Sequence, residues 1–483
     1  MKFLRTRSVA ELRERHGSRL KWAVLGTAMA GMVPAILSST MVFVAIPELS
    51  HHFQVGQERV QWVSSAFMIA QTLAMLLTPW LLIRYGLRIT FLAAILGLMA
   101  GGVGCAFAPT FPTLIAMRVL EGAASGVLQP IPAIVIMRAV PPEKQGRAMG
   151  IFGLGVVLVP ALAPVAGGFL LEHVGWQAIF LMVVPFCILA IALVQRYVGD
   201  DPTARQHDKP LDWVGLIWIG ISTVAILNGL TALDNAPVAA LWQIGLGVAG
   251  VASFVPYQLH KSEPLMRLRV FLHRQVAIGS LVAFMFGFGI FGVGYLTPVF
   301  LQMALGYSPS QSGLMQVPGF IAIGLVMPVA GRVTDQVPPH LVVTLGSTLL
   351  VVSIAAMAMV GPATSYIAAL TWITIGRLAL GIMSPALSIG SARGLARAEI
   401  PDAISVNGFA RQLGGAVGVS IVGVVLEWRL GVNRVGLIDL GVDLSQRARA
   451  FDQTFLIVAA ISAPAVLAGW FMRARMPSQH DPA

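Results

Sequence analysis

Two ionisable side chains lie close together within an otherwise apolar stretch of the chain. Arg118 and Glu121 stand three residues apart in the segment RVLEG, and an α-helix places residues at this spacing on one face. Burial disfavours the ionised form of a carboxyl group, whereas a neighbouring arginine favours it, so such a pair can exchange a proton near neutral pH. The same pair could also serve only to lock helix packing. We therefore predict a proton site at Arg118 and Glu121 and leave the packing role open.

Two further arginines, Arg377 and Arg411, lie deep in apolar stretches. A charged side chain at membrane depth is a candidate functional group by default. Each of these arginines could equally reach a membrane boundary or bind a neighbouring backbone carbonyl. The sequence leaves these roles open for both.

The other candidates for chemistry point away from an enzyme. All nine histidines fall in polar segments, and Cys105 and Cys187 lie in apolar blocks, where buried thiols are more common than disulfides. Metal-ligand spacing, paired carboxylates and a nucleophile with a base are all missing at membrane depth. We therefore predict no catalytic residue, metal site or cofactor, and keep a membrane-embedded lipid enzyme only as a remote alternative.

The elements that carry these residues are predicted to be membrane helices. Of the 483 residues, 57% are hydrophobic and only 11% are charged, against roughly a quarter charged in a soluble domain. The apolar residues form blocks of about 20, and a helix of that length crosses a hydrocarbon core of roughly 30 Å. The predicted fold class is therefore an all-α integral membrane protein, because only helices and closed barrels satisfy their backbone groups in lipid.

Apolar blocks and the polar residues between them predict fourteen spans. We place them at 22–46, 60–83, 89–108, 112–137, 148–171, 178–197, 213–233, 239–259, 275–303, 311–332, 341–361, 366–391, 404–428 and 452–472.

The basic residues test this layout, because cytoplasmic segments of membrane proteins carry an excess of Lys and Arg. Most of the 32 Lys and Arg residues fall in the two tails and in the alternate loops predicted on the same side. Both termini are therefore expected in the cytoplasm of a bacterial inner (plasma) membrane. The net charge of +11 then reflects topology and not a nucleic-acid partner. The opposite side holds Arg59, Arg429, Arg434, Arg447 and Arg449.

A faint internal repeat divides the chain. The turn at 79–88 after the second span resembles the turn at 330–340 after the tenth, and parallel repeats of six spans build one large class of transporters. The seventh and eighth spans are then an inserted pair. The predicted organisation is a cytoplasmic tail at 1–21, a six-helix bundle at 22–197, a linker with two inserted helices at 198–274, a second six-helix bundle at 275–472 and a cytoplasmic tail at 473–483.

Aromatic residues beside glycines can form a yielding apolar wall for varied ligands, with a few polar groups to orient them. The ninth span is dense in such rings, and amide side chains in other spans, including Gln302 at its end, could supply the polar groups. The same rings could instead pack against lipid or within the core. The predicted substrate-cavity residues are Phe67, Gln71, Gln129, Phe284, Phe288, Phe291, Tyr295 and Asn407.

Several segments, in chain order, resemble landmarks of the major facilitator superfamily, and specifically of the fourteen-span drug:proton antiporters of the EmrB/QacA type. They include TMVFVAIPEL in the first span, RVLEGAASGVLQP in the fourth, PPEKQGRAMGIFG before the fifth, LDWVGLI at the seventh and RQLGGAVGVSIVG in the thirteenth. The resemblance covers nearly the whole chain. It implies two pseudo-symmetric six-helix bundles around a central cavity, plus two extra helices, that alternate between inward-open and outward-open states.

The departures from this family pattern bear on the mechanism. The family usually carries an acidic residue in the first span just before the Thr of the pattern, where this chain has Ser38, Ser39 and Thr40. In the fourth span Arg118 matches the motif arginine, and Glu121 stands where Gln is usual. We therefore hypothesise that Glu121 has taken the role of the absent first-span carboxylate, because it can reach Arg118 along its own helix.

The same resemblance implies a set of gating residues. The Gly and Asp usual after the second span are replaced by Pro79 and Ile83, whereas the copy in the second half keeps both. The fifth span keeps the prolines and final glycines of an antiporter motif, which bend a helix and let another approach, but has Val159 and Ala163 where glycines are typical. The predicted gating residues are Arg84, Gly86, Arg88, Gly331, Asp335, Pro160, Pro164, Gly167 and Gly168.

The predicted function is secondary active export of small amphipathic or hydrophobic compounds, driven by proton antiport. The alternatives are export of one endogenous metabolite such as a fatty acid, antibiotic or siderophore, facilitation without proton coupling, and a regulatory relative that does not transport. The expected partners are a small-molecule substrate, protons and the lipid bilayer. The hairpin at 429–451 is the expected docking surface for a periplasmic adaptor protein.

Overall fold

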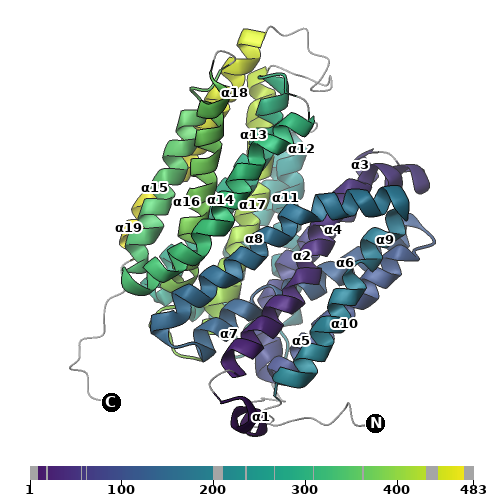
Figure 1. Cartoon of the computed structure of the whole chain (residues 1–483), viewed down its shortest axis with the longest axis vertical. Coiled ribbons are helices and arrows are strands. Elements are labelled where there is room, and N and C mark those ends of the chain that lie inside the picture. The colour runs from purple at the N-terminus through teal and green to yellow at the C-terminus, as the bar shows by residue number, and fades with distance from the viewer. Residues whose placement is uncertain are drawn as a thin grey trace.

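The computed structural model describes residues 9–17, 20–55, 57–60, 62–199, 210–233, 237–265, 267–307, 309–361, 364–430 and 444–472. The predicted tail at 473–483 lies outside these residues, as do residues 431–443 of the hairpin predicted to dock an adaptor. Within the described ranges every regular element is a helix, which confirms the predicted all-α fold class (Figure 1).

The helices overlap the predicted apolar blocks, because a chain in lipid must pair its own backbone groups, although some helices extend beyond their block and some blocks are divided. In chain order they are α1 (Val9–His16), α2 (Leu20–His52), α3 (Gln57–Val60), α4 (Trp62–Ala74), the 3-10 helix η3 (Met75–Leu77), α5 (Thr78–Ala106), α6 (Phe111–Leu128), α7 (Ile131–Ala139), α8 (Pro142–His173), α9 (Trp176–Leu181), α10 (Val183–Tyr197), α11 (Trp213–Thr231), α12 (Pro237–His260), the 3-10 helix η5 (Leu268–Leu272), α13 (Arg274–Met303), α14 (Pro309–Gln336), α15 (Pro339–Met357), α16 (Tyr366–Ala392), α17 (Ile400–Leu430), α18 (Leu444–Ser462) and α19 (Pro464–Phe471).

Among the described residues, twelve stretches are long and apolar enough to cross a membrane. One of them, Trp62–Ala106, has 45 residues, which at 1.5 Å per residue is about twice the hydrocarbon thickness. The chain turns within it at Gly86, which has a φ of +76°, and the Thr90 hydroxyl donates to the Leu81 carbonyl at 3.0 Å. This stretch therefore contains both the second and the third predicted span, and the total of fourteen remains a prediction.

The helices form two groups in space. Figure 1 shows α2 to α10 in one group and α13 to α19 in the other, with α8 and α14 packed against each other between them. We call residues 22–197 the first half and residues 275–472 the second half. The helices α11 and α12 pack on each other, and α11 also touches α4 of the first half and α17 of the second half.

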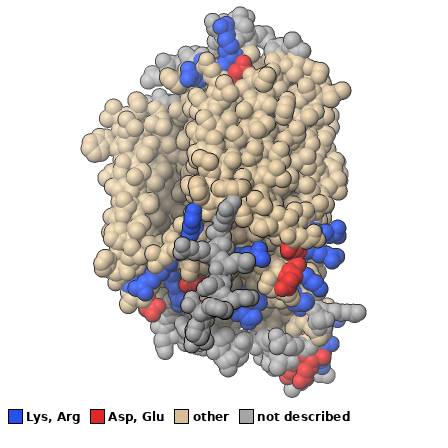
Figure 2. Space-filling view, turned by 90° about the vertical axis from the view of Figure 1, so that its left-hand side faces the viewer, with Lys and Arg blue, Asp and Glu red and all other residues tan. Residues whose placement is uncertain are grey.

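The two halves meet where α8 begins and α14 ends. A Cβ atom on Gly146 would overlap the carbonyl oxygen of Gly331, and one on Gly331 would overlap that of Gly146, so the two backbones are in direct contact. Further along, Gly150 lies against the backbone at Met327, and Leu154 lies against Gly324. We call this end of the molecule the basic end, because Figure 2 shows Lys and Arg side chains gathered there below a broad belt without charge.

A polar clasp closes α11 and α12 at the basic end. The buried carboxylate of Asp212 accepts hydrogen bonds from the Gly215 backbone at 2.8 Å, Tyr257 at 3.0 Å and Gln258 at 2.5 Å, and pairs with Lys261 at 2.6 Å. Burial acts to raise the pKa of Asp212, but the hydrogen bonds from Lys261, the Gly215 backbone, Gln258 and Tyr257 outweigh it and hold the pKa below its usual value. The hydrogen bonds to Asp212 and Tyr257 raise the pKa of Lys261.

These shifts predict the pH range over which the clasp stabilises the protein. A lowered carboxyl pKa contributes stability above about pH 4, and the contribution is lost as pH falls through the folded-state value. A raised lysine pKa contributes below about pH 10 and is lost as pH rises through its folded-state value. Asp212→Asn should therefore lower the thermal unfolding midpoint of the purified protein at pH 7, and the difference from wild type should shrink as the pH approaches 3. The exposed carboxylate of Glu172 supplies the control, since Glu172→Gln should leave the midpoint unchanged.

Candidate functional site

A close contact between α4 and α6 builds the predicted proton site. A Cβ atom on Gly122 would overlap the backbone of Phe67, and one on Gly126 would overlap the backbone of Gln71, so only glycine permits this approach. The same four-residue register places Arg118 opposite Val63, whose carbonyl accepts a hydrogen bond from Nε at 2.9 Å. The sequence thus brings the arginine to the backbone of a neighbouring helix.

Arg118 and Glu121 form the predicted ion pair. Nη1 of Arg118 lies 2.7 Å from Oε2 of Glu121, and both side chains have zero exposed surface. Ser38 of α2 completes the cluster, because its hydroxyl donates to Oε1 of Glu121 at 3.0 Å and accepts from Nη1 of Arg118 at 3.0 Å. The thiol of Cys105 on α5 lies 3.5 Å from Oε2 of Glu121.

The hydrogen-bond donors around Glu121 favour its ionised form, whereas its complete burial opposes ionisation. Arg118, Ser38 and Cys105 all direct a donor toward Glu121, and the Arg118 guanidinium lies 4.2 Å from the centre of the Phe67 ring. Nη2 of Arg118 has no hydrogen-bond partner among the described residues. A proton arriving at Glu121 would remove the counter-charge of a fully buried arginine, which requires rearrangement or the entry of water.

Sequence reasoning found the pair but did not single out Ser38. The structure brings Ser38 into contact with both members of the pair, and Ser38 belongs to the stretch where the family pattern has its acidic residue. The lack of an acidic residue in this stretch was the only signal in the sequence. It pointed to Ser38 only once the structure placed α2 beside α6. The Ser38 hydroxyl lies where a first-span carboxylate would meet Arg118.

Gln71, predicted to line the cavity, lies instead in a polar bridge between the halves in this structure. Its amide donates to the Ser125 hydroxyl at 2.8 Å, and its oxygen accepts from Gln412 of α17 at 3.1 Å. Ser125 stands one helical turn after Glu121, and Gln71 stands one turn after Phe67, so this bridge lies directly beside the ion pair. A shift of α4 or α6 would therefore reach the second half through Gln71.

The other predicted cavity residues lie in several environments. Phe288 is buried, with its backbone against Gly418, while Phe284 and Tyr295 are half-buried and Phe291 is 38% exposed. Asn407 of α17 accepts a hydrogen bond from the Ser280 hydroxyl at 2.8 Å. Their assignment to a cavity remains a prediction.

Two amide side chains expected to supply polar groups, one from the predicted cavity set and one from the end of the ninth span, differ in burial. Gln129, at the end of α6, is half-buried, and its Oε1 has no hydrogen-bond partner among the described residues. Gln302, near the end of α13, is exposed.

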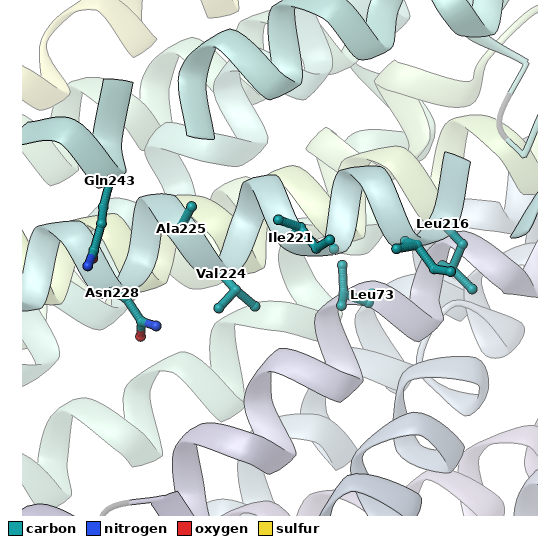
Figure 3. Close-up of a pocket in the computed structure, with 9 residues that line it drawn as sticks. Leu73, Leu216, Ile221, Val224, Ala225, Asn228 and Gln243 are labelled. Carbon is teal, nitrogen blue, oxygen red and sulfur yellow. The ribbon is translucent and has the colours of Figure 1, made fainter. Parts of the chain in front are cut away.

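A groove lies elsewhere, on the outer side of α11. It has a volume of about 580 Å³, and Figure 3 shows Leu216, Ile221, Val224 and Ala225 along one wall, with Leu73 of α4 opposite and the polar ends of Asn228 and Gln243 at one end. Ile217 and Ile221 are 57% and 67% exposed, so the groove faces the surroundings that lipid would occupy. It contains none of the residues predicted for the substrate cavity.

The predicted gating residues Gly331 and Asp335 lie at the interface of the halves. Oδ1 of Asp335 accepts from the Gly146 backbone at 2.6 Å, and Oδ2 accepts from the Arg147 backbone at 3.0 Å. These bonds join the end of α14 to an early turn of α8, whose peptide dipoles favour a negative charge. Asp335 therefore fastens the second half onto the first at the basic end.

For the gating residues predicted in the first half, the structure shows contacts to other parts of the first half and to Val198, which directly follows it. Arg84 lies over the rings of Trp80 and Tyr85, and Arg88 is buried and donates to the Val198 carbonyl at 3.1 Å. On α8, Pro160 is half-buried, and Gly167 lies against Met41 and Val44 of α2, whereas open space surrounds Gly168. The side chain of Pro164 lies outside the described residues.

The buried ion pair makes a prediction about stability. Glu121→Leu should cost about 3–5 kcal/mol because it leaves Arg118 as an uncompensated buried charge. Adding Arg118→Met should recover most of that loss, since two apolar side chains replace the pair. Urea or thermal unfolding of the purified single and double variants measures both effects. Equal losses in the single and double variants would show that the pair is not the source of the cost.

The contact at Asp335 makes a prediction about conformation. Asp335→Asn exchanges one accepting oxygen for a donor and removes the charge. The lost contact should cost about 1.5–3 kcal/mol. The equilibrium between joined and separated halves should therefore shift by roughly tenfold or more toward separation at the basic end. Spin labels at Tyr85 and Gln336, both exposed, report this as a longer distance, with Cys105 and Cys187 first replaced by Ala. The control is Glu143→Gln, which removes an exposed charge from the first turn of α8 and should leave the distances unchanged.

Comparisons with other proteins place this fold in a known context. The chain is 28% identical over 418 residues to "Multidrug resistance protein B homolog" of Mycobacterium tuberculosis (strain ATCC 25618 / H37Rv), covering 85% of this chain and 77% of the relative. It is 25% identical over 419 residues to "Tetracenomycin C resistance and export protein" of Streptomyces glaucescens, covering 85% and 77%.

Solved structures share the fold at low sequence identity. The human organic anion transporter MFSD10 matches with a TM-score of 0.65 and 15% identity over 94% of this chain and 99% of that chain. The proton:xylose symporter XylE, bound to 6-bromo-6-deoxy-D-glucose, matches with a TM-score of 0.64 and 14% identity over 93% and 96%.

The sequence also fits the family model described as "Major Facilitator Superfamily" across residues 28–419, which is most of the chain. That match, the all-helical membrane fold and the packing of its two halves agree with one another. The chain therefore belongs to the major facilitator superfamily and is a membrane transporter.

Proposed function

We propose that this transporter exports small amphipathic compounds from a bacterial cell in exchange for protons, with Glu121 as the proton-carrying residue. The contact between Ser38 and Glu121 carries the proposal. The residues that the family pattern would use for the proton are Ser38, Ser39 and Thr40 here, and Ser38 touches a carboxylate that enters from α6. The carboxylate is thus present at the expected place although it comes from another helix.

The described contacts support a cycle of alternating access. In this structure the halves are joined at the basic end by Gly146, Gly331 and Asp335, and Glu121 is surrounded by donors. The distribution of positive charge favours a cytoplasmic location for that end. We take this arrangement as the state closed toward the cytoplasm, with the proton released. Proton binding at Glu121 would weaken its contacts to Ser38 and Arg118 and favour a different packing of α2, α4 and α6.

The relatives support the direction of transport and the class of substrate. One relative is named for multidrug resistance and the other for resistance to and export of tetracenomycin C, so both names describe resistance and one describes export. The substrate range of this chain is tested by a panel of amphipathic cations, neutral compounds and anions in a drug-sensitive host. Protection against many members supports a multidrug exporter, and protection against one supports a dedicated exporter.

Moving the carboxylate back to α2 provides the sharpest test of coupling. In proteoliposomes, Glu121→Gln should abolish proton movement driven by an exported substrate, because the site then lacks a carboxylate that can take up and release the proton. The double variant Ser38→Asp with Glu121→Gln should restore it, since a carboxylate again faces Arg118. A pH-sensitive dye and a substrate flux assay measure both quantities on the same vesicles.

The control for this test is Glu48→Gln, which removes an exposed carboxylate of α2 outside the cluster and should leave coupling intact. Full coupling in Glu121→Gln would overturn the assignment of the proton site. Flux in the wild type that ignores the pH gradient would identify a facilitator instead.

A further inference from the structure

The second half contains a counterpart of the Arg118 site. Arg377 of α16 lies in the segment RLALG, which repeats RVLEG with Leu380 in the place of Glu121. The guanidinium of Arg377 lies 4.5 Å from the centre of the Phe320 ring on α14, and that of Arg118 lies 4.2 Å from the Phe67 ring on α4. Both halves therefore hold an arginine against a phenylalanine of a neighbouring helix.

The two arginines differ in their counter-charge. Arg377 donates from Nη2 to Oε1 of Gln316 at 3.2 Å, and it has no ion pair with any described residue. The helix α16 contains no Asp or Glu, and the only acidic residue of α14 is Asp335, which is 19 positions or about 28 Å along the helix from Gln316. A cation at this depth is costly unless an anion neutralises it, and neither α16 nor the adjacent part of α14 carries a carboxylate beside Arg377.

Gln316, the partner of Arg377, shares a face of α14 with other side chains. The hydroxyl of Ser312 is buried and has no hydrogen-bond partner within the described part of the chain, and Gln316 follows one turn later on α14. The four-residue spacing of Ser312, Gln316 and Phe320 puts them on one face of α14. The opposite face carries the exposed apolar residues Leu314, Val317, Ile321 and Leu325, so the polar face is directed into the protein.

Accessibility separates this site from the proton site. Arg118 has no exposed surface, whereas Arg377, Gln316 and Phe320 are each only half-buried. A guanidinium has five N–H donors, and the bond to Gln316 uses one of them. Arg411 of α17 is also half-buried and without an ion pair among the described residues, which adds a further positive charge within an apolar stretch of this half.

We propose that Arg377, Gln316 and Ser312 form an anion subsite, and that the transporter therefore exports amphipathic organic anions with a carboxylate or sulfonate group. The guanidinium pairs with the planar anionic group through parallel N–H donors, and the Ser312 hydroxyl donates to it. The Phe320 ring and the neighbouring apolar side chains contact the hydrophobic part of the compound. This inference rests on the proposed export function and specifies the charge of its substrate.

Matched aromatic compounds test the inference on the purified full-length protein. Radiolabelled 1-naphthoate is bound in a scintillation proximity assay and competed with 1-naphthalenesulfonate, neutral 1-naphthalenemethanol and cationic 1-naphthylmethylammonium. The wild type should bind the two anions at least tenfold more tightly than the neutral and cationic compounds. Arg377→Gln should remove that preference, and Arg377→Lys should restore part of it.

A second variant tests the missing counter-charge directly. Leu380→Glu recreates the three-residue spacing of Arg118 and Glu121, so the new carboxylate should form an ion pair with Arg377. Anion binding should then fall by tenfold or more although the arginine is still present. Arg429→Gln, an exposed arginine at the far end of α17, is the matched control and should bind as the wild type does. Size-exclusion profiles show whether each variant is folded. If Leu380→Glu does not fold, the binding data of Arg377→Gln alone decide whether the anion subsite exists.

The outcomes separate this inference from the export function. Equal binding of charged and neutral compounds by the wild type, or an unchanged anion preference in Arg377→Gln, overturns the anion subsite. If a cationic or neutral compound is nevertheless pumped in exchange for protons, the export function stands and only the substrate class is wrong. If folded protein in vesicles moves no compound of any charge, the export function itself fails.

Discussion

A charge buried at membrane depth is costly unless a counter-charge lies within reach, because the bilayer supplies neither water nor ions. The first half meets this constraint with Arg118 and Glu121, which share one turn of α6, and with Ser38, which reaches both from α2. Gly122 and Gly126 also stabilise this charge, because they let α4 approach α6 closely. At this distance the Val63 carbonyl accepts a hydrogen bond from the Arg118 guanidinium. Packing and electrostatics therefore depend on one helix contact, and a transporter that changes protonation here must also change its packing.

Much of the fold could be predicted from the sequence, because the length of an apolar block fixes the length of a membrane helix. The span expected at 275–303 is α13 at Arg274–Met303, and the span expected at 239–259 is α12 at Pro237–His260. Interruptions were less predictable. The block at 112–137 is divided into α6 and α7 around Pro130, and the block at 452–472 into α18 and α19 before Pro464. Hydropathy is insensitive to a proline that breaks the hydrogen-bond ladder inside an apolar run.

The site was predictable only where its partners lie on one helix. Three-residue spacing identified Arg118 with Glu121, whereas the contacts of Ser38 and of Gln412 depend on how separate helices are placed, which one sequence does not record. The same limit applies to the join between the halves. Asp335 was expected from its motif, whereas nothing in the sequence pointed to Arg138 of α7, whose Nε and Nη2 donate to the Arg397 carbonyl at 3.2 and 3.0 Å. Two unlike contacts therefore close the basic end, one through a carboxylate and one through a guanidinium.

The division of charge between the halves has a consequence for the driving force. A proton site in the first half and an anion subsite in the second would let the transporter bind the two ions at separate places. Exchange of one inward proton for one outward monovalent anion moves the equivalent of two positive charges into the cell, which at 100 mV is worth about 4.6 kcal/mol. A neutral substrate would gain only half of this, and one pH unit adds about 1.4 kcal/mol per proton. The membrane potential would then be the main source of energy for export, and an unpaired Arg377 would be the feature of the fold that makes this possible.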